Sequence, residues 1–416
     1  MKNQTVAHSV DKQYFDLVVA GGNYVGLSLA VAIKQALPEI GVCVVEPRHQ
    51  KELVKDSRSS AVAAAARNLL NVLGVWADIE PHAQPINDMV ITDSKLSDVV
   101  RPTFLTFDGK LDDGQPFAHM VPNGVMVASL YQKALQSNVT LITGDLVSNF
   151  DLTASGVQIE LKSGLQIRTK LLAAADGVRS SLRELAGISV VQVPYDQIGI
   201  VTTVAHERPH EGRAIEHFLP SGPFAILPLK GNQSSLVWSE KTYEAERLLK
   251  MDDFTFQIEL ERRFGRRLGD LEILARPRGF PLGLSLARSF VKNRFALLGD
   301  AAHGIHPIAG QGLNLGFKDV AALAETVVNA ARLGQDFGTL DVLENYQQWR
   351  RFDTVQMGIT SDVLNRVFSN NSEPMRFIRD FGLGLVDRIP ALKTYFINEA
   401  AGGGDHAPRL LQGELI

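Results

Sequence analysis

The sequence contains a single cysteine among its 416 residues, so no disulfide can form within the chain. Cys43 lies in the apolar run 41–45, and this setting favours a small buried side chain in a strand over a reactive thiol. Chains without disulfides are typical of reducing compartments. The sequence therefore predicts a cytoplasmic protein.

Long apolar runs and a basic excess are also missing. No apolar stretch approaches the ~18 residues that a membrane-spanning helix needs, and the polar segment 1–12 lacks the apolar middle of a signal peptide. Lys and Arg number 42 against 46 Asp and Glu, which leaves no surplus of positive charge for a nucleic-acid backbone. We expect no nucleic-acid partner and a globular protein that does not span a membrane.

What the sequence does contain begins with a βαβ pattern. Residues 15–20 form a short β-branched run, a helical pattern follows over residues 25–36, and residues 42–45 form a second apolar run. A strand, a glycine turn, a helix and a second strand make up a βαβ unit. The chain is too long for one core of ordinary size, and it shows neither an internal repeat nor a low-complexity linker. Interleaved domains are therefore expected.

The glycine turn of this unit reads GGNYVG at residues 21–26. In the usual G-x-G-x-x-G pattern the glycines make the turn, admit a pyrophosphate and allow close helix packing. Asn23 replaces the second glycine; asparagine tolerates positive φ, but its side chain would sit where a pyrophosphate comes closest. Glu46 ends the second strand, where an acid can accept hydrogen bonds from a ribose. The pattern predicts a dinucleotide site.

Two further motifs follow one another near residue 300. LLGDAAH, at residues 297–303, places Asp300 after a strand, where its carboxylate can hold polyol hydroxyls or cap a helix. HPIAGQGLNLG, at residues 306–316, offers bare glycine backbone to a flat ring and a helix N-terminus behind it. His303 and His306 lack an obvious third ligand, so we expect no metal.

The fourth motif, DGVRSSLR at residues 176–183, follows a strand-like run. Its residue types alone favour a turn followed by a capped helix over a binding site.

In this order the four motifs resemble those of the single-component FAD-dependent aromatic hydroxylases. Within that group the chain resembles the ubiquinone-biosynthesis hydroxylases of the UbiH/VisC type, most closely over residues 299–316 and again in FLPSGPFAILPL at residues 218–229. The resemblance implies an α/β fold: a Rossmann-like FAD-binding domain (1–75, 106–187 and 280–340), interleaved with a β-sheet substrate domain (76–105 and 188–279) and followed by a helical C-terminal region (341–416).

The resemblance also implies roles at matching positions. The implied cofactor-binding set is Gly21, Gly22, Asn23, Gly26, Glu46, Arg58, Asn123, Asp176, Asp300, Pro307, Gly310, Gly312 and Asn314. Within it, Asp300 would hold the ribityl chain, and Pro307, Gly310 and Gly312 would form the environment of the isoalloxazine and its hydroperoxide. No side-chain base is assigned.

The implied reaction is a monooxygenation. NAD(P)H would reduce the flavin, O2 would give a C4a-hydroperoxide, and one oxygen atom would pass to a (poly)prenylated phenol of ubiquinone biosynthesis. No separate nicotinamide-binding βαβ unit is evident, which fits transient docking of NAD(P)H.

Such a substrate lives in the bilayer, so we expect peripheral contact with the inner face of the cytoplasmic membrane, and other enzymes of the pathway as partners. Phe377, Phe381 and Leu385 form a candidate membrane-facing stripe, although packing on the protein's own core is the favoured interpretation of that stripe.

Two other functions stay open at this point. A flavin hydroxylase of a small soluble aromatic acid would need an arginine for the carboxylate. A non-catalytic, flavoprotein-like scaffold subunit is suggested by Asn23.

Overall fold

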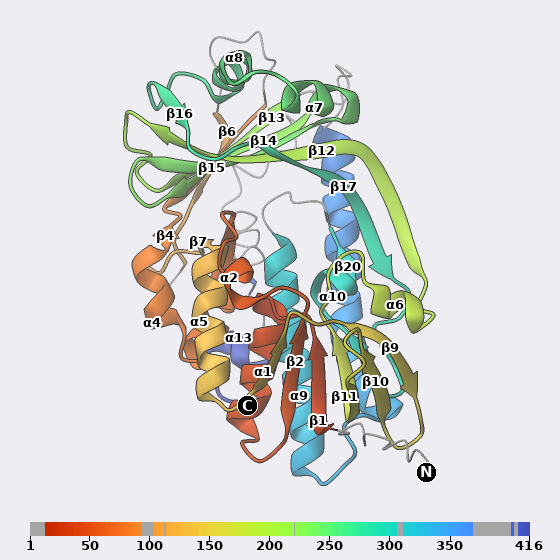
Figure 1. The fold of residues 1–416 in the computed structure, drawn as a ribbon. Coiled ribbons are helices and arrows are strands. Elements are labelled where there is room, and N and C mark those ends of the chain that lie inside the picture. Colours follow the sequence, from red (N-terminus) through yellow and green to blue (C-terminus); the bar gives the residue numbers. More distant parts are fainter. Residues whose placement is uncertain are drawn as a thin grey trace, which may run out of the picture.

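Two large sheets, one below the other in Figure 1, organise the molecule. The computed structural model describes residues 13–93, 103–111, 114–219, 221–305, 311–368, 401–402 and 407–416.

The lower sheet is mainly parallel and buried. Its strands run in the order β18 (Val291–Lys292), β19 (Phe295–Leu297), β11 (Gln166–Ala174), β1 (Gln13–Ala20), β2 (Val42–Glu46) and β8 (Thr140–Thr143), with β9 (Val147–Leu152) and β10 (Val157–Leu161) joined beside β11. β1 pairs in parallel with both β11 and β2, and every residue of β2 is buried, as expected for a strand covered on both faces. The carboxyl ends of β1, β2 and β11 therefore meet at one edge, where ligands bind in such sheets.

Helix α1 (Tyr24–Ala36) connects β1 to β2, so the predicted βαβ unit is confirmed. It packs against α9 (Gln311–Arg332) and α5 (Asn123–Gln136). The short helices are α2 (Gln50–Leu53), α3 (Ala64–Val72), α4 (Trp76–Ile79), α6 (Ser181–Leu185) and α13 (Arg409–Gln412). Two 3-10 turns, η1 (Glu80–His82) and η2 (Gly299–Ala301), are also present among the described residues.

The upper sheet contains the remaining long strands. Their order is β20 (His303–Gly304), β17 (Arg278–Ala287), β12 (Val190–His206), β15 (Gln233–Lys241), β14 (Gly222–Leu229), β13 (Arg213–Leu219), β5 (Asp88–Asp93) and β6 (Thr103–Asp108), with β16 (Leu271–Ile273) beside β12. Helices α7 (Thr242–Leu249) and α8 (Asp253–Phe264) cover its outer face (Figure 1). A core that includes Phe224, Trp238 and Phe256 fills the space beneath them.

The chain enters the upper sheet more than once. Strands β5 and β6 pair with each other in antiparallel orientation. β5 joins the sheet by pairing in parallel with β13, a partner more than a hundred residues away that no local pattern could reveal. The two sheets are thus interleaved along the chain, as the fold class predicted.

A small sheet lies between the two large ones. It consists of β3 (Ser59–Ala63), β7 (Ala118–Pro122) and β4 (Gln84–Pro85). Ala118 and Met120 of this sheet pack with Ala214 of β13, and Leu227 of β14 lies against them. This contact fixes one face of the upper sheet against the lower half of the molecule.

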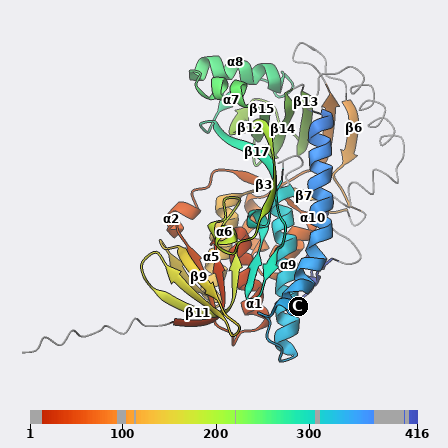
Figure 2. The ribbon, with the colours of Figure 1, turned by 90° about the vertical axis from the view of Figure 1, so that its right-hand side faces the viewer.

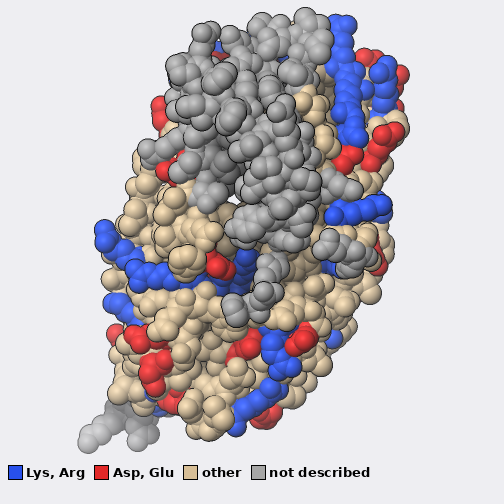
Figure 3. Space-filling model, turned by 180° about the vertical axis from the view of Figure 1, so that it is seen from behind, with Lys and Arg blue, Asp and Glu red and all other residues tan. Residues whose placement is uncertain are grey.

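Helix α10 (Leu340–Phe368) runs beside α9 from the lower half toward the upper sheet (Figure 2). In the part of the chain that the structure describes, no helix combines the length and apolar character needed to cross a bilayer. Phe377, Phe381 and Leu385, proposed above as a membrane-facing stripe, lie outside the described residues. On the face in Figure 3, acidic and basic side chains are interspersed over the lower half, in keeping with the nearly balanced composition.

Candidate active site

The turn between β1 and α1 is built around glycines that no other residue could replace. Gly21 has φ +113°, and a Cβ on it would lie 2.3 Å from the carbonyl oxygen of Ala175. A Cβ on Gly26 would lie 1.9 Å from the carbonyl oxygen of Gly21. The turn therefore brings α1 as close to the sheet as bare backbone allows, with its N-terminal N–H groups turned toward the sheet edge.

Asn23 is the N-cap of α1 and takes an ordinary extended conformation, with φ −87°. The tolerance of asparagine for positive φ is therefore not used. Its Oδ1 accepts a hydrogen bond of 2.8 Å from the N–H of Tyr24. The side chain thus occupies one of the helix N-terminal donors that would otherwise face a phosphate.

Glu46 lies beneath the glycine turn and is almost fully saturated with hydrogen bonds. Its Oε2 accepts from the N–H of Gly22 at 2.7 Å, and its Oε1 accepts from the N–H and Nε of Arg48. A carboxylate offers about four acceptor positions, so about one is left for a ribose hydroxyl. A Cβ on Gly22 would lie 2.7 Å from the Glu46 Cβ, so a side chain at position 22 would clash with the side chain of Glu46.

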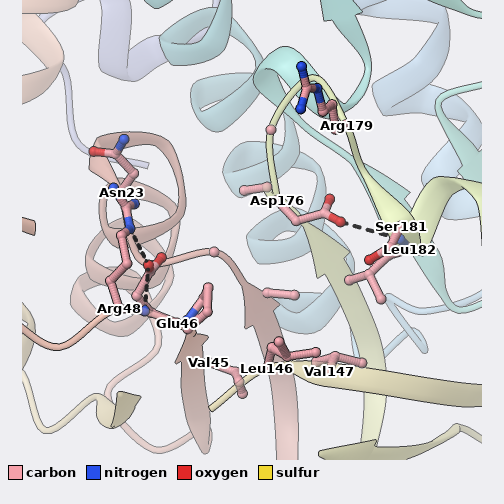
Figure 4. Close-up of a pocket in the computed structure, with 15 residues that line it drawn as sticks. Asn23, Val45, Glu46, Arg48, Leu146, Val147, Asp176, Arg179, Ser181 and Leu182 are labelled. Atoms are coloured by element: carbon pink, nitrogen blue, oxygen red, sulfur yellow. Dashed lines mark hydrogen bonds and ion pairs between the residues drawn. The ribbon is translucent and has the colours of Figure 1, made fainter. Parts of the chain in front are cut away.

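A cavity of about 400 Å³ opens at this edge of the lower sheet. Figure 4 shows Asn23, Glu46 and Arg48 on one side of it and Asp176 and Arg179 on the other. Arg48 and Arg179 were not singled out from the sequence. Arg48 follows the strand-ending acid by two residues, a spacing that could have pointed to it.

Asp176 follows β11 and faces the start of α6. The Ser180 hydroxyl donates to its Oδ1 at 2.5 Å, and the N–H of Leu182 donates to Oδ2. Burial raises the pKa of Asp176, although these hydrogen bonds oppose the shift. Ser180 also caps α6 by accepting from the N–H of Arg183 at 3.0 Å, so the turn and capped helix favoured from the sequence are present, and Asp176 lines the cavity as well.

A second group of predicted residues gathers around Arg58. Its guanidinium forms a two-point ion pair with Asp56 (Nη2 to Oδ2 2.7 Å), and Asn123 donates to the same carboxylate at 3.3 Å. Asp300 is exposed, yet surrounding protein desolvates its carboxyl and raises its pKa, while His303 and Arg58 act in the opposite direction. The structure thus brings Arg58, Asn123 and Asp300 into one neighbourhood.

The glycine turn at residues 21–26 and the two motifs near residue 300 are packed together at Val25. A Cβ on Gly316 would lie 2.8 Å from a Val25 methyl group and 3.7 Å from the Cα of Gly299. Glycine at both positions lets α1, α9 and the turn before Asp300 approach one another. The turn at Asp300 and the first turns of α9 therefore lie directly beside the start of α1.

Below this turn lies a buried charge network that the sequence did not reveal. Asp319 accepts from the N–H of Gly299 at 2.8 Å, from Arg350 Nε at 2.8 Å, and bonds His303 Nε2 at 2.5 Å. Burial alone would raise the pKa of Asp319, but His303 and Arg350 outweigh it and lower the pKa. The network holds the turn that carries Asp300, and it gives His303 a carboxylate partner. His306 lies outside the described residues.

The start of α9 is anchored to the small sheet. Asn314 accepts from the N–H of Ala63 at 2.9 Å and donates to the carbonyl oxygen of Ala61 at 3.0 Å. It therefore positions the helix through the backbone of β3. A Cβ on Gly312 would meet open space, so this position is free to face a ligand. Pro307 and Gly310 lie outside the described residues.

These features fit FAD. The glycine cradle and the helix N-terminus suit a pyrophosphate, and the buried acid suits a ribose at the edge of the cavity. Asp300 and the start of α9 lie next to the glycine turn through the packing at Val25. A dinucleotide with a long polyol link requires such an extended site.

Comparison with known proteins agrees. The family described as FAD binding domain matches residues 14–353. The ubiquinone hydroxylase UbiL of Rhodospirillum rubrum is 40% identical, over 98% of this chain and 95% of its own. The 3-demethoxyubiquinol 3-hydroxylase of Escherichia coli is 35% identical, over 93% and 98%. The structure of p-nitrophenol 4-monooxygenase PnpA from Pseudomonas putida superposes with a TM-score of 0.79, covering 94% and 99%, at 19% identity.

The fold and the site thus define an FAD-dependent monooxygenase, with FAD as cofactor and NAD(P)H as co-substrate. More narrowly, the chain belongs to the FAD-dependent hydroxylase family of ubiquinone biosynthesis.

Proposed function

We propose that this enzyme hydroxylates the ring of a (poly)prenylated phenol in ubiquinone biosynthesis. One atom of O2 enters a ring C–H bond as a hydroxyl group. The other leaves as water, with NAD(P)H and a proton supplying the reducing equivalents. Full-length similarity to a ubiquinone hydroxylase supports this substrate class.

The observation that carries the proposal is the composition of the upper sheet's inner face. Phe280 of β17 lies under the Arg58 guanidinium at 5.6 Å, so the face that carries Phe280 looks toward the cofactor site. The centre of that face includes Val201, Ala225 and Val237. Arg278 of β17 lies opposite Val201 at the edge of this face, whereas the centre is apolar. The apolar centre supports a prenylated phenol as the substrate.

When bound, FAD supplies hydride acceptance from NAD(P)H and activation of O2. The residues of this chain would position FAD and the substrate and keep water out of the site. The glycine turn and Glu46 would hold the adenosine half, and Asp300 the ribityl link. Asn314 fixes the start of α9, and the apolar centre of the inner face would exclude water, which otherwise diverts the reaction toward H2O2.

The remaining assignments of residues to FAD stay proposals. Gly21, Gly22, Gly26 and Asp176 would surround the pyrophosphate and ribose. Arg58 and Asn123 would contact the cofactor from the side of β3, and Pro307, Gly310 and Gly312 would line the isoalloxazine.

Because a prenylated phenol resides in the bilayer, we also propose peripheral contact with the inner face of the cytoplasmic membrane. Flotation with anionic vesicles tests this proposal. The enzyme should float with the vesicles at low salt, and it should stay at the bottom of the gradient at high salt or when no vesicles are present.

Substrate choice is tested with the FAD-loaded enzyme, by following NAD(P)H oxidation, hydroxylated product and H2O2. A short-chain prenylphenol should be hydroxylated with little H2O2, and 4-hydroxybenzoate should not be. Hydroxylation of the benzoate alone would instead select the soluble-acid alternative. An enzyme that binds FAD but oxidises no NAD(P)H with any phenol would support the scaffold alternative.

A further inference from the structure

One acid, Glu216, lies on the inner face of the upper sheet. The row of residues that crosses the sheet beside it is apolar on β5, β14, β15 and β12 and reaches Arg278 on β17. Residues directly opposite in neighbouring strands point to the same face. Glu216 of β13 lies opposite Ala225 of β14 and Ile91 of β5. Ala225 lies opposite Val237, and Val237 opposite Val201. These paired residues therefore form one row that crosses the sheet, and Glu216 belongs to it.

The rows on either side show that this face looks toward the cofactor site. Two residues before Glu216, Ala214 packs on the small sheet that contains Ala61, whose carbonyl oxygen accepts from Asn314 at the start of α9. At the other edge of the sheet, Phe280 lies one row further along the same face and contacts Arg58. Glu216 thus lies between two contacts of this face with the residues around the candidate FAD site, one made by Ala214 and the other by Phe280.

Glu216 is 5% exposed, and within the described part of the chain its carboxyl forms no hydrogen bond and no ion pair. Its flanking positions on β13, β14 and β5 are apolar: Ala214, Phe218, Ala225 and Ile91. Helix α10 also packs against β14 and carries Asp353 and Asp362.

Neither of these acids perturbs Glu216. Burial alone raises the pKa of Glu216 to about 7. A buried carboxyl without a partner is costly to a fold, and such groups concentrate where chemistry needs them.

We propose that Glu216 is the catalytic base that accepts the proton of the substrate phenol, bound between this face and the start of α9. This inference rests on the proposed hydroxylation of a phenol. The phenol O–H bond breaks, its electron pair stays on oxygen, and the proton forms a new O–H bond on the Glu216 carboxylate. The resulting phenolate ring is richer in electrons and accepts electrophilic oxygen more readily. A carboxylate made more basic by burial is better suited to this transfer than an ordinary one.

The test compares the FAD-loaded wild type with Glu216→Gln, which keeps the shape of the side chain, and with Glu216→Asp, which keeps a carboxyl but shortens its reach. Glu272→Gln serves as the control, because Glu272 is an exposed acid of β16 in the same sheet. Each variant is first titrated with FAD to confirm an unchanged flavin spectrum. Hydroxylation of a short-chain prenylphenol is then measured as a function of pH, and glutamate carboxyls labelled with ¹³C are titrated by NMR.

In the wild type we expect a carboxyl resonance that titrates near pH 7 and is missing from Glu216→Gln, and a pH profile that rises through the same midpoint. Glu216→Gln should lower kcat by roughly 10²- to 10⁴-fold and abolish that rise. Glu216→Asp should keep the rise at a lower kcat, and the control should match the wild type.

The proposal is overturned if Glu216→Gln binds FAD and keeps the wild-type kcat and pH profile. Should Glu216→Gln fail to fold, a wild-type resonance or rate profile without a midpoint between about pH 6 and 8 overturns it equally. A wild type that hydroxylates no phenol overturns the proposed function itself, and the two failures are therefore distinguishable.

Discussion

Replacing Glu216 by glutamine should make the protein more stable at alkaline pH and leave its stability unchanged in acid. Burial raises the pKa of Glu216 from 4.5 to about 7 in the folded state. Below pH 4.5 the carboxyl is protonated whether the chain is folded or not, so it costs nothing. As the pH rises toward 7 the unfolded chain ionises first and is favoured. At about 1.4 kcal/mol per pKa unit, the full cost above pH 7 is about 3 kcal/mol.

Urea unfolding of the FAD-loaded wild type and Glu216→Gln, at pH 4.5 and pH 8, measures this difference. Equal free energies of unfolding are expected at the lower pH, and a gain of about 3 kcal/mol for the variant at the higher pH. Glu272→Gln should stay within about 0.5 kcal/mol of the wild type at both. A gain for Glu216→Gln that is the same at both pH values, or below about 1 kcal/mol at pH 8, would show that the carboxyl is not buried as described.

The other predictions concern the lower half of the molecule. Asp319→Asn removes the buried anion of Arg350 and leaves it only the more exposed carboxylate of Asp353. It should lower the free energy of unfolding at pH 7 by about 3–5 kcal/mol, whereas Asp88→Asn, at a partly exposed ion pair, should cost at most about 1 kcal/mol. Because the folded-state pKa of Asp319 is lowered, its contribution should be complete above about pH 4 and decline below it. Asn23→Gly should tighten FAD binding by a few-fold in a fluorescence titration, since it frees a helix N–H at a capping cost of only a few tenths of a kcal/mol; unchanged or weaker binding would contradict this. Gly26→Ala should abolish FAD binding in the same titration, and retention of wild-type affinity would refute the close packing described.

Features that depend on residues close together in the sequence were predictable. The strand, glycine turn and helix that begin at Phe15 form a local pattern with one structural solution, and the acid that ends β2 follows from its position. The lack of a linker predicted interleaved domains, and the resemblance added the family. The place of Asp300 after a strand also follows from a local motif.

Features that depend on contacts between residues far apart in the sequence were not predictable. Asp319 and Arg350 each lie in an ordinary helical pattern, and only the crossing of α9 and α10 joins them. Glu216 is one polar residue in a strand, and its importance appears only when the register of β5, β13 and β14 shows that its neighbours are apolar. The pairing of β5 with β13 is a further example, since a strand stabilised by a distant partner needs no strong pattern of its own.

The antiparallel pair β12 and β17 has a mechanical consequence. The two strands descend together from the upper sheet toward α6 (Figure 1), and their lower end is held by the pairing of β17 with β20. Their register breaks between Pro194 and Gln197, where Asp196 has φ +52°. An irregularity of this kind interrupts the ladder and weakens it locally against bending. Any shift of the upper sheet relative to the lower sheet must therefore bend this pair of strands, and the interrupted ladder at Pro194–Gln197 is a weak point of the pair.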